Sequence, residues 1–252
     1  MKRTAWSIVG WSTHALFGVT VYYLFLFLRG PTHPPALDAA DHRSAAIDLL
    51  LALQFAVPHS LLLLPGVRKR LTAYVPSPMY GVFFCLCTCA SLLLLMALWR
   101  PSGTLIWNLQ GAARAAVQGA FYASWAALFY SLHLTGLGFQ TGWTPWRAWL
   151  RGRTAPREFH PRSVYRLFRH PVYFSFLGLI WFTPVMTLDR AVLTGVWTAY
   201  IFFGSWLKDR RLEFYLGEPY REYAARVPGY PGIVFGPLGR RTAKGRRRIA
   251  QL

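Results

Sequence analysis

The densest group of side chains capable of chemistry lies between residues 165 and 173, directly before an apolar segment. It combines phenol, guanidinium and imidazole groups: Tyr165, Arg166, Arg169, His170 and Tyr173. Pro171 suits the first turn of a helix, where its missing N–H is not needed. The free N–H groups of that turn, with Arg169 and His170 beside them, favour binding of an anion or carboxylate. Arginine and aromatic residues are also common at membrane interfaces, so both interpretations stay open here.

A second polar group follows the last apolar segment and carries both signs of charge: Lys208, Asp209, Arg210, Arg211 and Glu213. If the last two apolar segments fold back as a hairpin, this group faces the first one. The carboxylate of Asp209 or Glu213 would then lie near the His170 imidazole and the neighbouring Arg169. A carboxylate facing a basic entrance binds a zwitterionic ligand with a carboxylate, a cationic centre and ribose hydroxyls. Spacing alone favours the alternative, a solvated charge run with pairs inside one helix.

A short helix is predicted to begin at Glu218-Pro219 and to end at the sequence PGYP, residues 228–231. One of its faces carries aromatic and apolar side chains: Tyr220, Tyr223 and Val227. This pattern is typical of a helix that lies in the plane of a membrane interface. Such a helix either caps a ligand cavity or rests on lipid, and both alternatives stay open.

Three histidines, His14, His59 and His133, lie within apolar segments. Polar groups at membrane depth are costly and call for a functional hypothesis. A pair of histidines on different helices would ligate a haem, whereas a single one bonds a neighbouring carbonyl; the structural interpretation is favoured for each. All three cysteines lie in one apolar segment and give neither a disulfide framework nor a zinc spacing. No metal site is predicted.

The elements that position these groups follow from composition. The 252 residues are 54% hydrophobic and only 15% charged, against about 25% charged in soluble domains, which excludes a water-soluble domain. A helix of roughly 20 apolar residues crosses a bilayer. Six apolar segments are of suitable or nearly suitable length: 5–28, 45–64, 80–99, 115–137, 172–187 and 191–207. Residues 188–190 alone separate the last two, which predicts a tight helical hairpin.

The sequence therefore predicts an all-α, polytopic integral membrane protein. We expect about six transmembrane helices with a C-terminal helical hairpin and a cytoplasmic amphipathic cap. Residues 1–137 would form an N-terminal four-span bundle. Residues 138–252 would supply a cytoplasmic loop, the hairpin and a basic tail, and would form the cofactor-binding region. No repeat typical of a transporter is visible, and the one acidic candidate within a span, Asp48, lies close to the membrane surface.

Orientation follows from the basic residues. With six spans, one side of the membrane holds 23 Lys and Arg residues and the other holds five: Arg29, Arg43, Arg100, Arg114 and Arg190. We therefore expect the protein in the inner or plasma membrane, with both termini in the cytoplasm. The basic cytoplasmic face attracts anionic lipid headgroups. The tail basic residues, from Arg240 to Arg248, are not assigned to nucleic acid, because no folded reader of bases accompanies them.

Two segments resemble the membrane methyltransferases that include isoprenylcysteine carboxyl methyltransferase and the phospholipid methyltransferases. RHPVYFS at 169–175 is similar to that family's Arg-His-Pro-x-Tyr-x-Gly element. KDRRLEFYLGEPYREYAARVPGYP at 208–231 is similar to its Glu-Glu-x-x-Leu…Tyr-x-x-Tyr…Pro element. The resemblance implies that the two elements embrace S-adenosylmethionine at the cytoplasmic ends of a helical hairpin. Ser175 and Lys208 depart from the pattern, standing where the family has Gly and Glu.

Shorter matches extend the resemblance along the chain, at 55–60 (FAVPHS), 71–78 (LTAYVPSP), 98–101 (LWRP) and 181–187 (WFTPVMT). They are similar to bacterial methanethiol S-methyltransferases and to NnrU-type membrane proteins. The first similarity implies methylation of a small thiol or lipid-soluble acceptor, with conversion of methanethiol to dimethyl sulfide as the leading hypothesis. The second implies the alternative of a non-enzymatic protein that carries haem or assists assembly of respiratory enzymes.

The resemblance implies roles for individual residues. Arg169 and His170 are the predicted catalytic residues, because their positive charge would favour an ionised acceptor. The predicted cofactor-binding residues surround both elements: Tyr165, Arg169, His170, Pro171, Tyr173, Ser175, Asp209, Leu212 and Tyr220. His59 and Tyr80 are predicted to contact the substrate, which would enter by a membrane-facing mouth lined by spans two to four. No general base is identified.

Overall fold

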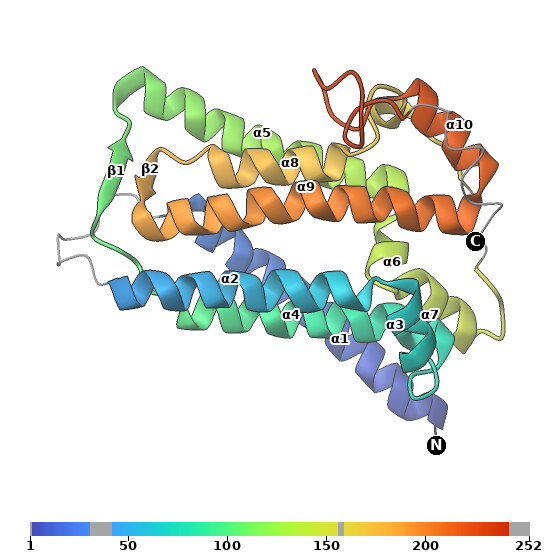
Figure 1. Cartoon of the computed structure of the whole chain (residues 1–252). Helices are drawn as coiled ribbons and strands as arrows, with labels where there is room; N and C mark the ends of the chain where they lie inside the picture. The colour runs from blue at the N-terminus through green and yellow to red at the C-terminus, as the bar shows by residue number, and fades with distance from the viewer. Residues whose placement is uncertain (1, 31–41, 156–158, 242–252) are drawn as a thin grey trace.

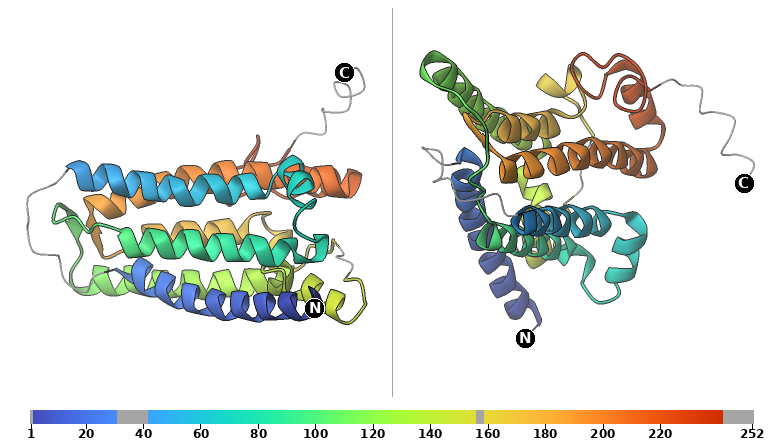
Figure 2. Two further views of the ribbon diagram at one scale, coloured as in Figure 1. Left: turned by 90° about the horizontal axis from the view of Figure 1, so that it is seen from below. Right: turned by 60° about the vertical axis from the view of Figure 1, so that its left-hand side comes forward.

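The computed structural model describes residues 2–30, 42–155 and 159–241 and consists mainly of helices that run along roughly one direction (Figures 1 and 2). The six longest segments of the bundle are α1 (Lys2–Arg29), α2 (His42–Leu62), α4 (Tyr80–Leu98), α5 (Gly111–Thr135), α8 (Pro171–Trp181) and α9 (Leu188–Leu216). Short helices gather at one end of the bundle: α3 (Pro65–Leu71), α6 (Leu137–Gln140), α7 (Trp143–Leu150) and α10 (Glu218–Arg226). Two single turns, η1 (Ser77–Met79) and η2 (Ser163–Arg166), complete the helical elements of this described part.

Three of the described helical segments are long and apolar enough to cross a membrane: Thr4–Arg29, Ser44–Leu62 and Ser77–Leu98. The prediction of a mainly helical membrane protein is confirmed at this level. Helix α8 has only 11 residues, which at 1.5 Å per residue is about half of the roughly 30 Å hydrocarbon core. The predicted apolar segment 172–187 is therefore not one continuous helix.

The remainder of that segment forms a strand, and the all-α expectation needs this correction. β2 (Val185–Thr187) pairs antiparallel with β1 (Leu105–Asn108) at the end of the bundle away from the short helices. Pro184 explains the change, because proline lacks an N–H and disfavours the helical conformation at the residue before it. The hairpin connection thus spans residues 182–187, whereas residues 188–190 belong to the first turn of α9.

Asp189 and Arg190, predicted to lie in a turn, fasten this end of the bundle. Asp189 accepts hydrogen bonds from the Trp99 indole at 2.9 Å, the Ser102 amide at 3.1 Å and the Thr187 hydroxyl at 2.5 Å. Arg190 donates to the carbonyls of Phe27 and Leu28 in the last turn of α1, where a cation is favourable. Asp48, near the start of α2, is fully buried and accepts from the Arg100 amide at 3.0 Å. These contacts hold α1, α2 and α9 to the loop that precedes β1.

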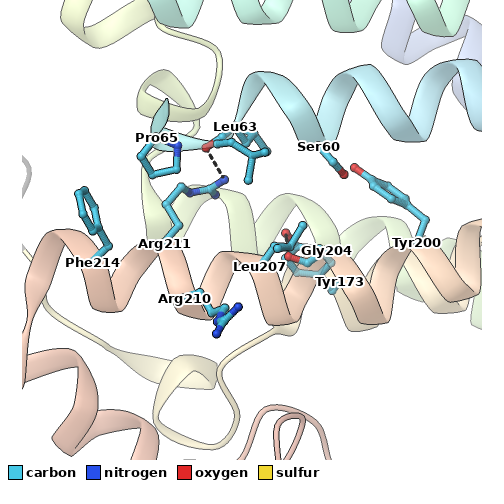
Figure 3. A pocket seen from close by; sticks show the side chains of 11 residues that line it. Ser60, Leu63, Pro65, Tyr173, Tyr200, Gly204, Leu207, Arg210, Arg211 and Phe214 are labelled. Atoms are coloured by element: carbon cyan, nitrogen blue, oxygen red, sulfur yellow. Dashed lines mark hydrogen bonds between the residues drawn. The ribbon is translucent and has the colours of Figure 1, made fainter. Parts of the chain in front are cut away.

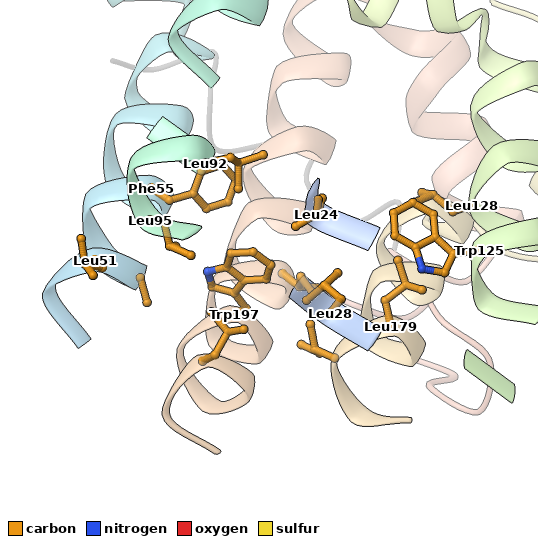
Figure 4. Packing of buried hydrophobic residues seen from close by; sticks show 14 of the residues in the cluster. Leu24, Leu28, Leu51, Phe55, Leu92, Leu95, Trp125, Leu128, Leu179 and Trp197 are labelled. Carbon is orange, nitrogen blue, oxygen red and sulfur yellow. The ribbon is translucent and has the colours of Figure 1, made fainter. Parts of the chain in front are cut away.

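One apolar core contains side chains from all six long helices (Figure 4). Its labelled members are Leu24, Leu28, Leu51, Phe55, Leu92, Leu95, Trp125, Leu128, Leu179 and Trp197. Helix α8 packs on α5, and α9 packs on α2, so the hairpin is inserted into the N-terminal helices. The division of the chain at residue 137 stays a prediction, and residues from both sides of it share this core.

A second, smaller contact joins α1 to α7. Trp146 is completely buried and packs with Met79 and Val82. Its indole ring also covers Gly10 of α1 so closely that an added Cβ would overlap the ring. Gly18, two turns further along α1, has open space around the corresponding position. Glycine at position 10 therefore sets the distance between α1 and α7.

We predict that Gly10→Ala lowers the stability of the purified protein by about 1–3 kcal/mol, because the Trp146 ring must move out of its place. Gly18→Ala is the matched control on the same helix. It is expected to leave stability unchanged or to raise it by up to about 1 kcal/mol, since alanine favours helix over glycine. Thermal unfolding in detergent, followed by tryptophan fluorescence, measures both. Equal effects of the two substitutions would contradict this account of the α1–α7 contact.

Candidate functional site

The predicted motifs meet in a buried cluster at the end of the bundle that carries the short helices. Arg169 Nη2 lies 2.7 Å from Asp209 Oδ2, and the two residues are 2% and 1% exposed. Asp209 Oδ1 accepts a hydrogen bond from the Tyr220 hydroxyl and lies 3.1 Å from His170 Nε2. We call Arg169, His170, Asp209 and Tyr220 the buried clasp. The expected approach of Asp209 to His170 is thus observed, whereas Glu213 lies instead 2.9 Å from Arg241.

The other amino group of Arg169 binds backbone. Nη1 donates to the carbonyls of Ala224 at 3.1 Å, Val227 at 2.5 Å and Gly239 at 2.9 Å. Two of these carbonyls belong to the C-terminal end of α10, where unpaired acceptors need donors. The Arg169 amide also donates to the Pro228 carbonyl at 2.8 Å. Arg169 therefore joins the start of α8 to α9, to α10 and to the segment after it.

Burial and charge set the protonation of the clasp. Burial raises the pKa of the Asp209 carboxyl, but the His170 imidazole and the Arg169 guanidinium outweigh burial and hold this pKa well below its ordinary value. Burial also lowers the pKa of His170, more than the contact with Asp209 raises it. Burial, and then the negative charge of Asp209, raise the pKa of Tyr220. These shifts favour the carboxylate form of Asp209 and the neutral forms of His170 and Tyr220.

The other predicted cofactor residues have mainly internal contacts. Tyr165 is buried, donates to the Ser131 carbonyl at 3.3 Å and accepts at its own carbonyl from the Tyr223 hydroxyl at 2.5 Å. Ser175 donates to the Pro171 carbonyl, one turn earlier in α8, at 2.9 Å. Pro171 occupies the first turn of α8, as predicted. Leu212 packs beneath α10. Their contact with a cofactor stays a prediction.

A cavity of about 320 Å³ lies beside the clasp (Figure 3). Its walls come from the end of α2, the start of α3, helix α8 and one face of α9: Ser60, Leu63, Leu64, Pro65, Tyr173, Tyr200, Gly204, Leu207, Arg210, Arg211 and Phe214. Of the predicted spans two to four, only α2 contributes to this cavity, and a substrate mouth lined by all three spans stays a prediction. The third and fourth apolar segments became α4 and α5, whereas the hairpin helices α8 and α9 replace them at the cavity.

Tyr173 is the one predicted cofactor residue among the residues that line this cavity. Its ring meets the His170 ring edge-on at a centroid distance of 5.6 Å. Its hydroxyl lies 3.5 Å from the Gly204 carbonyl, and Lys208 Nζ lies 5.3 Å from the ring centroid. Tyr173 thus stands between the buried clasp and the cavity, so a shift of the clasp would move the cavity wall.

The two arginines of the cavity differ in position. Arg211 points toward Leu63 and Pro65, and its Nη1 lies 3.5 Å from the Leu63 carbonyl (Figure 3). Arg210 is exposed, and its guanidinium stacks on the Trp206 ring at 4.5 Å. Within the described part of the chain, neither arginine has a carboxylate within ion-pair distance. The cavity is therefore positively charged and otherwise mainly apolar.

The predicted substrate residues lie near the cavity without lining it. The His59 ring packs against Tyr200 at a centroid distance of 6.1 Å, and its Nδ1 lies 3.3 Å from the Thr88 hydroxyl. The Tyr80 hydroxyl donates to the Leu62 carbonyl at 2.6 Å. The other two histidines predicted within apolar segments have different surroundings. His14 packs on Trp143 and Trp146 of α7, and His133 is exposed.

Sequence reasoning missed the residues of the cavity, although a signal for part of them was present. Residues 200, 204, 207, 211 and 214 follow helical spacing and therefore lie on one face. The signal was hidden because the last span was expected to end at residue 207, whereas α9 continues to Leu216. Ser60 and Leu63 come from a distant helix, and nothing in their local sequence indicates a cavity.

Comparisons with known proteins agree with the predicted resemblance. Methanethiol S-methyltransferase 1 of Bradyrhizobium diazoefficiens is 32% identical over 226 residues, which cover 87% of this chain and 79% of the relative. Methanethiol S-methyltransferase of Mycobacterium tuberculosis is 29% identical over 237 residues, covering 90% and 96%. The chain belongs to the methanethiol S-methyltransferase family. Nurim of Xenopus laevis is also similar, at 28% identity over 165 residues, or 62% of this chain and 58% of that protein.

Membership in the methanethiol S-methyltransferase family makes the chain a membrane methyltransferase, as predicted. The alternative of a haem carrier or assembly factor is not favoured by these relatives. No protein-family model matches the chain, and no solved structure is significantly similar to it.

For this methyltransferase we predict that Asp209→Asn lowers the free energy of unfolding by about 3–5 kcal/mol, because it leaves the buried Arg169 guanidinium without its counter-charge. Glu213→Gln is the matched control, one turn along the same helix. The Glu213 side chain is 26% exposed in its ion pair with Arg241, so its loss should cost about 1 kcal/mol or less. Denaturant unfolding in detergent measures both. A loss at Asp209 no larger than at Glu213 would show that the clasp does not hold the helices together.

Proposed function

We propose that this chain transfers a methyl group from S-adenosylmethionine to a small thiol, with methanethiol as the first acceptor to test and dimethyl sulfide as its product. The single observation that carries the proposal is the cationic, mainly apolar cavity beside the buried clasp. Methanethiol is chosen as the acceptor because the relatives are methanethiol S-methyltransferases by name. A small thiol has one polar atom, and an apolar cavity with few polar groups is the kind of site that would hold it.

The residues of the cavity fit the methyl donor in type. The cavity volume of about 320 Å³ is at the lower end of the range for small-molecule sites, which is about 300–1,000 Å³. The hydroxyls of Ser60, Tyr173 and Tyr200 offer hydrogen bonds to ribose, and the exposed Arg210 at the rim offers a charge to the methionyl carboxylate. When bound, the donor supplies a methyl group on a positively charged sulfur. The protein supplies alignment of the reacting atoms, which is worth roughly 7–11 kcal/mol.

In this proposal the buried clasp positions the site. Arg169 and His170, predicted as catalytic, are 2% and 0% exposed, so we assign them to hold α8 against α9 and α10. Asp209 and Tyr220 complete this connection, and Tyr173 transmits it to the cavity wall. His59 and Tyr80 would act on the acceptor indirectly, by supporting Tyr200 and the end of α2.

We also propose the finer membrane arrangement. In it α5, the α8–β2 segment and the 191–207 part of α9 cross the bilayer with the three apolar helices, giving six crossings and cytoplasmic termini. Helix α10 would lie as a cap at the cytoplasmic interface, with Tyr220, Tyr223 and Ala224 turned into the protein. The basic residues of this end, including Arg68, Lys69 and Arg70 of α3, would contact anionic lipid headgroups. The tail residues 242–252 lie outside the described part.

The arrangement predicts the accessibility of single cysteines placed in a cysteine-free variant. Cysteines at Lys69 and Arg153 should react with a membrane-impermeant maleimide only after the membrane is opened. Cysteines at Ser102 and Gly111, at the opposite end of the bundle, should react in intact cells. Labelling of all four positions from the same side would contradict the proposed crossings.

The activity prediction uses the space in the cavity. The purified protein with methyl-labelled S-adenosylmethionine and methanethiol should release labelled dimethyl sulfide. Gly204→Leu should lower this rate by about 10²-fold, because the side chain grows between Tyr173 and Tyr200 and displaces the reactants. Gly195→Leu is the matched control on α9, at an exposed position with open space. The rate of Gly195→Leu should equal that of the wild type. An equal loss of rate in both variants would show that the reaction does not depend on this cavity.

A further inference from the structure

Arg211 is a charged residue of the cavity that has no role in the contacts described above. It is not part of the clasp, and the proposed binding of the donor does not use it. Its side chain is half-buried and lies among Leu63, Pro65 and Phe214. The hydrogen bond from its guanidinium to the Leu63 carbonyl is long, at 3.5 Å. Within the described part of the chain it forms no ion pair. A cation in an apolar wall that lacks a counter-charge indicates a site for an anion.

Two other arginines near the cavity have partners of their own. The Arg169 guanidinium is neutralised by Asp209 and donates to three carbonyls. Arg210 stacks on Trp206 at the exposed side of α9. By contrast, Arg211 lines the cavity together with Tyr173 and Tyr200. Arg211 therefore places a positive charge in the cavity wall beside two tyrosines.

The cavity also lacks a base. Among the described residues, its polar side chains are three hydroxyls and two arginines, and no carboxylate or imidazole of that part of the chain lines it. A thiol becomes a good nucleophile only as the thiolate. A positive charge within about 4–6 Å favours the ionised form of an acidic group, and a cavity poor in water strengthens this effect. A single cation can thus replace a general base, provided that the acceptor enters or ionises as the anion.

We propose that Arg211 is a catalytic residue that binds the acceptor as its thiolate. This inference rests on the proposed function. The thiol loses its proton to bulk water, and the thiolate sulfur sits against the guanidinium. The thiolate electron pair then forms the new sulfur–carbon bond to the methyl group. The bond from that carbon to the donor sulfur breaks, its electron pair stays on the donor sulfur, and that sulfur becomes neutral. No oxidant, reductant or further reactant is needed.

The first test observes ionisation without turnover. The probe is 4-nitrothiophenol, whose thiol and thiolate absorb at different wavelengths, titrated with pH in protein-containing and protein-free detergent. We expect the wild-type protein to lower the pKa of the bound probe by about one unit or more. Arg211→Gln should abolish this shift, and Arg211→Lys should retain most of it because the charge remains. Arg210→Gln is the matched control and should keep the shift. Persistence of the shift in Arg211→Gln would overturn the proposal.

The second test uses methanethiol and S-adenosylmethionine. For Arg211→Gln, kcat/KM at neutral pH should fall about tenfold, which is the change that a one-unit rise in acceptor pKa produces, and the acid limb of the pH profile should move up by the same unit. Raising the pH should restore the rate. Thermal unfolding checks that the variant is folded. If calorimetry shows instead that Arg211→Gln weakens donor binding and leaves the pH profile unchanged, Arg211 serves the donor carboxylate and the proposal is wrong.

The two tests separate this inference from the function on which it rests. A wild-type protein that methylates no thiol, yet shifts the bound probe through Arg211, would refute the proposed function and leave the anion site in place. A wild-type protein that forms dimethyl sulfide with the same pH profile as Arg211→Gln would support the function and refute the role of Arg211.

Discussion

The ion pair between Arg169 and Asp209 is the contact on which the arrangement of the C-terminal helices depends. A guanidinium that is almost fully removed from water is tolerated only with a counter-charge and with partners for its remaining N–H groups. Asp209 provides the charge, and the carbonyls at the end of α10 provide acceptors. The start of α8, helix α9 and the end of α10 are thereby fixed in one geometry. Removal of either charge would leave the other buried, so the pair acts as one unit.

Helix α9 connects this pair to the cavity because it presents different faces to each. Ser205 and Asp209 are turned inward toward the clasp, whereas Gly204, Leu207 and Arg211 face the cavity. Both sets occur in the same two turns, where each residue is rotated by about 100° from the next. The charged sequence 208–213 is consequently divided by function: one carboxylate stabilises the fold, and one arginine is available to a ligand.

The sequence allowed prediction of the clasp more fully than of the cavity. The predicted hairpin placed Asp209 or Glu213 near His170, and the structure selects Asp209. The Glu218-Pro219 start of α10 followed from helix-terminus rules and agrees with the structure. The sequence analysis included Val185, Met186 and Thr187 in a span, because hydropathy does not distinguish an apolar strand from a helix. The continuation of α9 beyond residue 207 was not predicted because a charge run usually marks exposure, whereas the burial of Asp209 depends on partners from α8 and α10. The wall contributed by Ser60 arises from packing between helices, which no local pattern contains.

The contact between Arg169 and the Gly239 carbonyl has a consequence for the order of biosynthesis. The guanidinium is translated about seventy residues before this acceptor, so α8 is synthesised while the acceptor is still unmade. Until residue 239 has left the ribosome, one N–H direction of Arg169 has only water or lipid headgroups as partners. The segment around Gly239 thus closes a structure that the earlier helices have prepared, and assembly of the clasp is tied to synthesis of this segment.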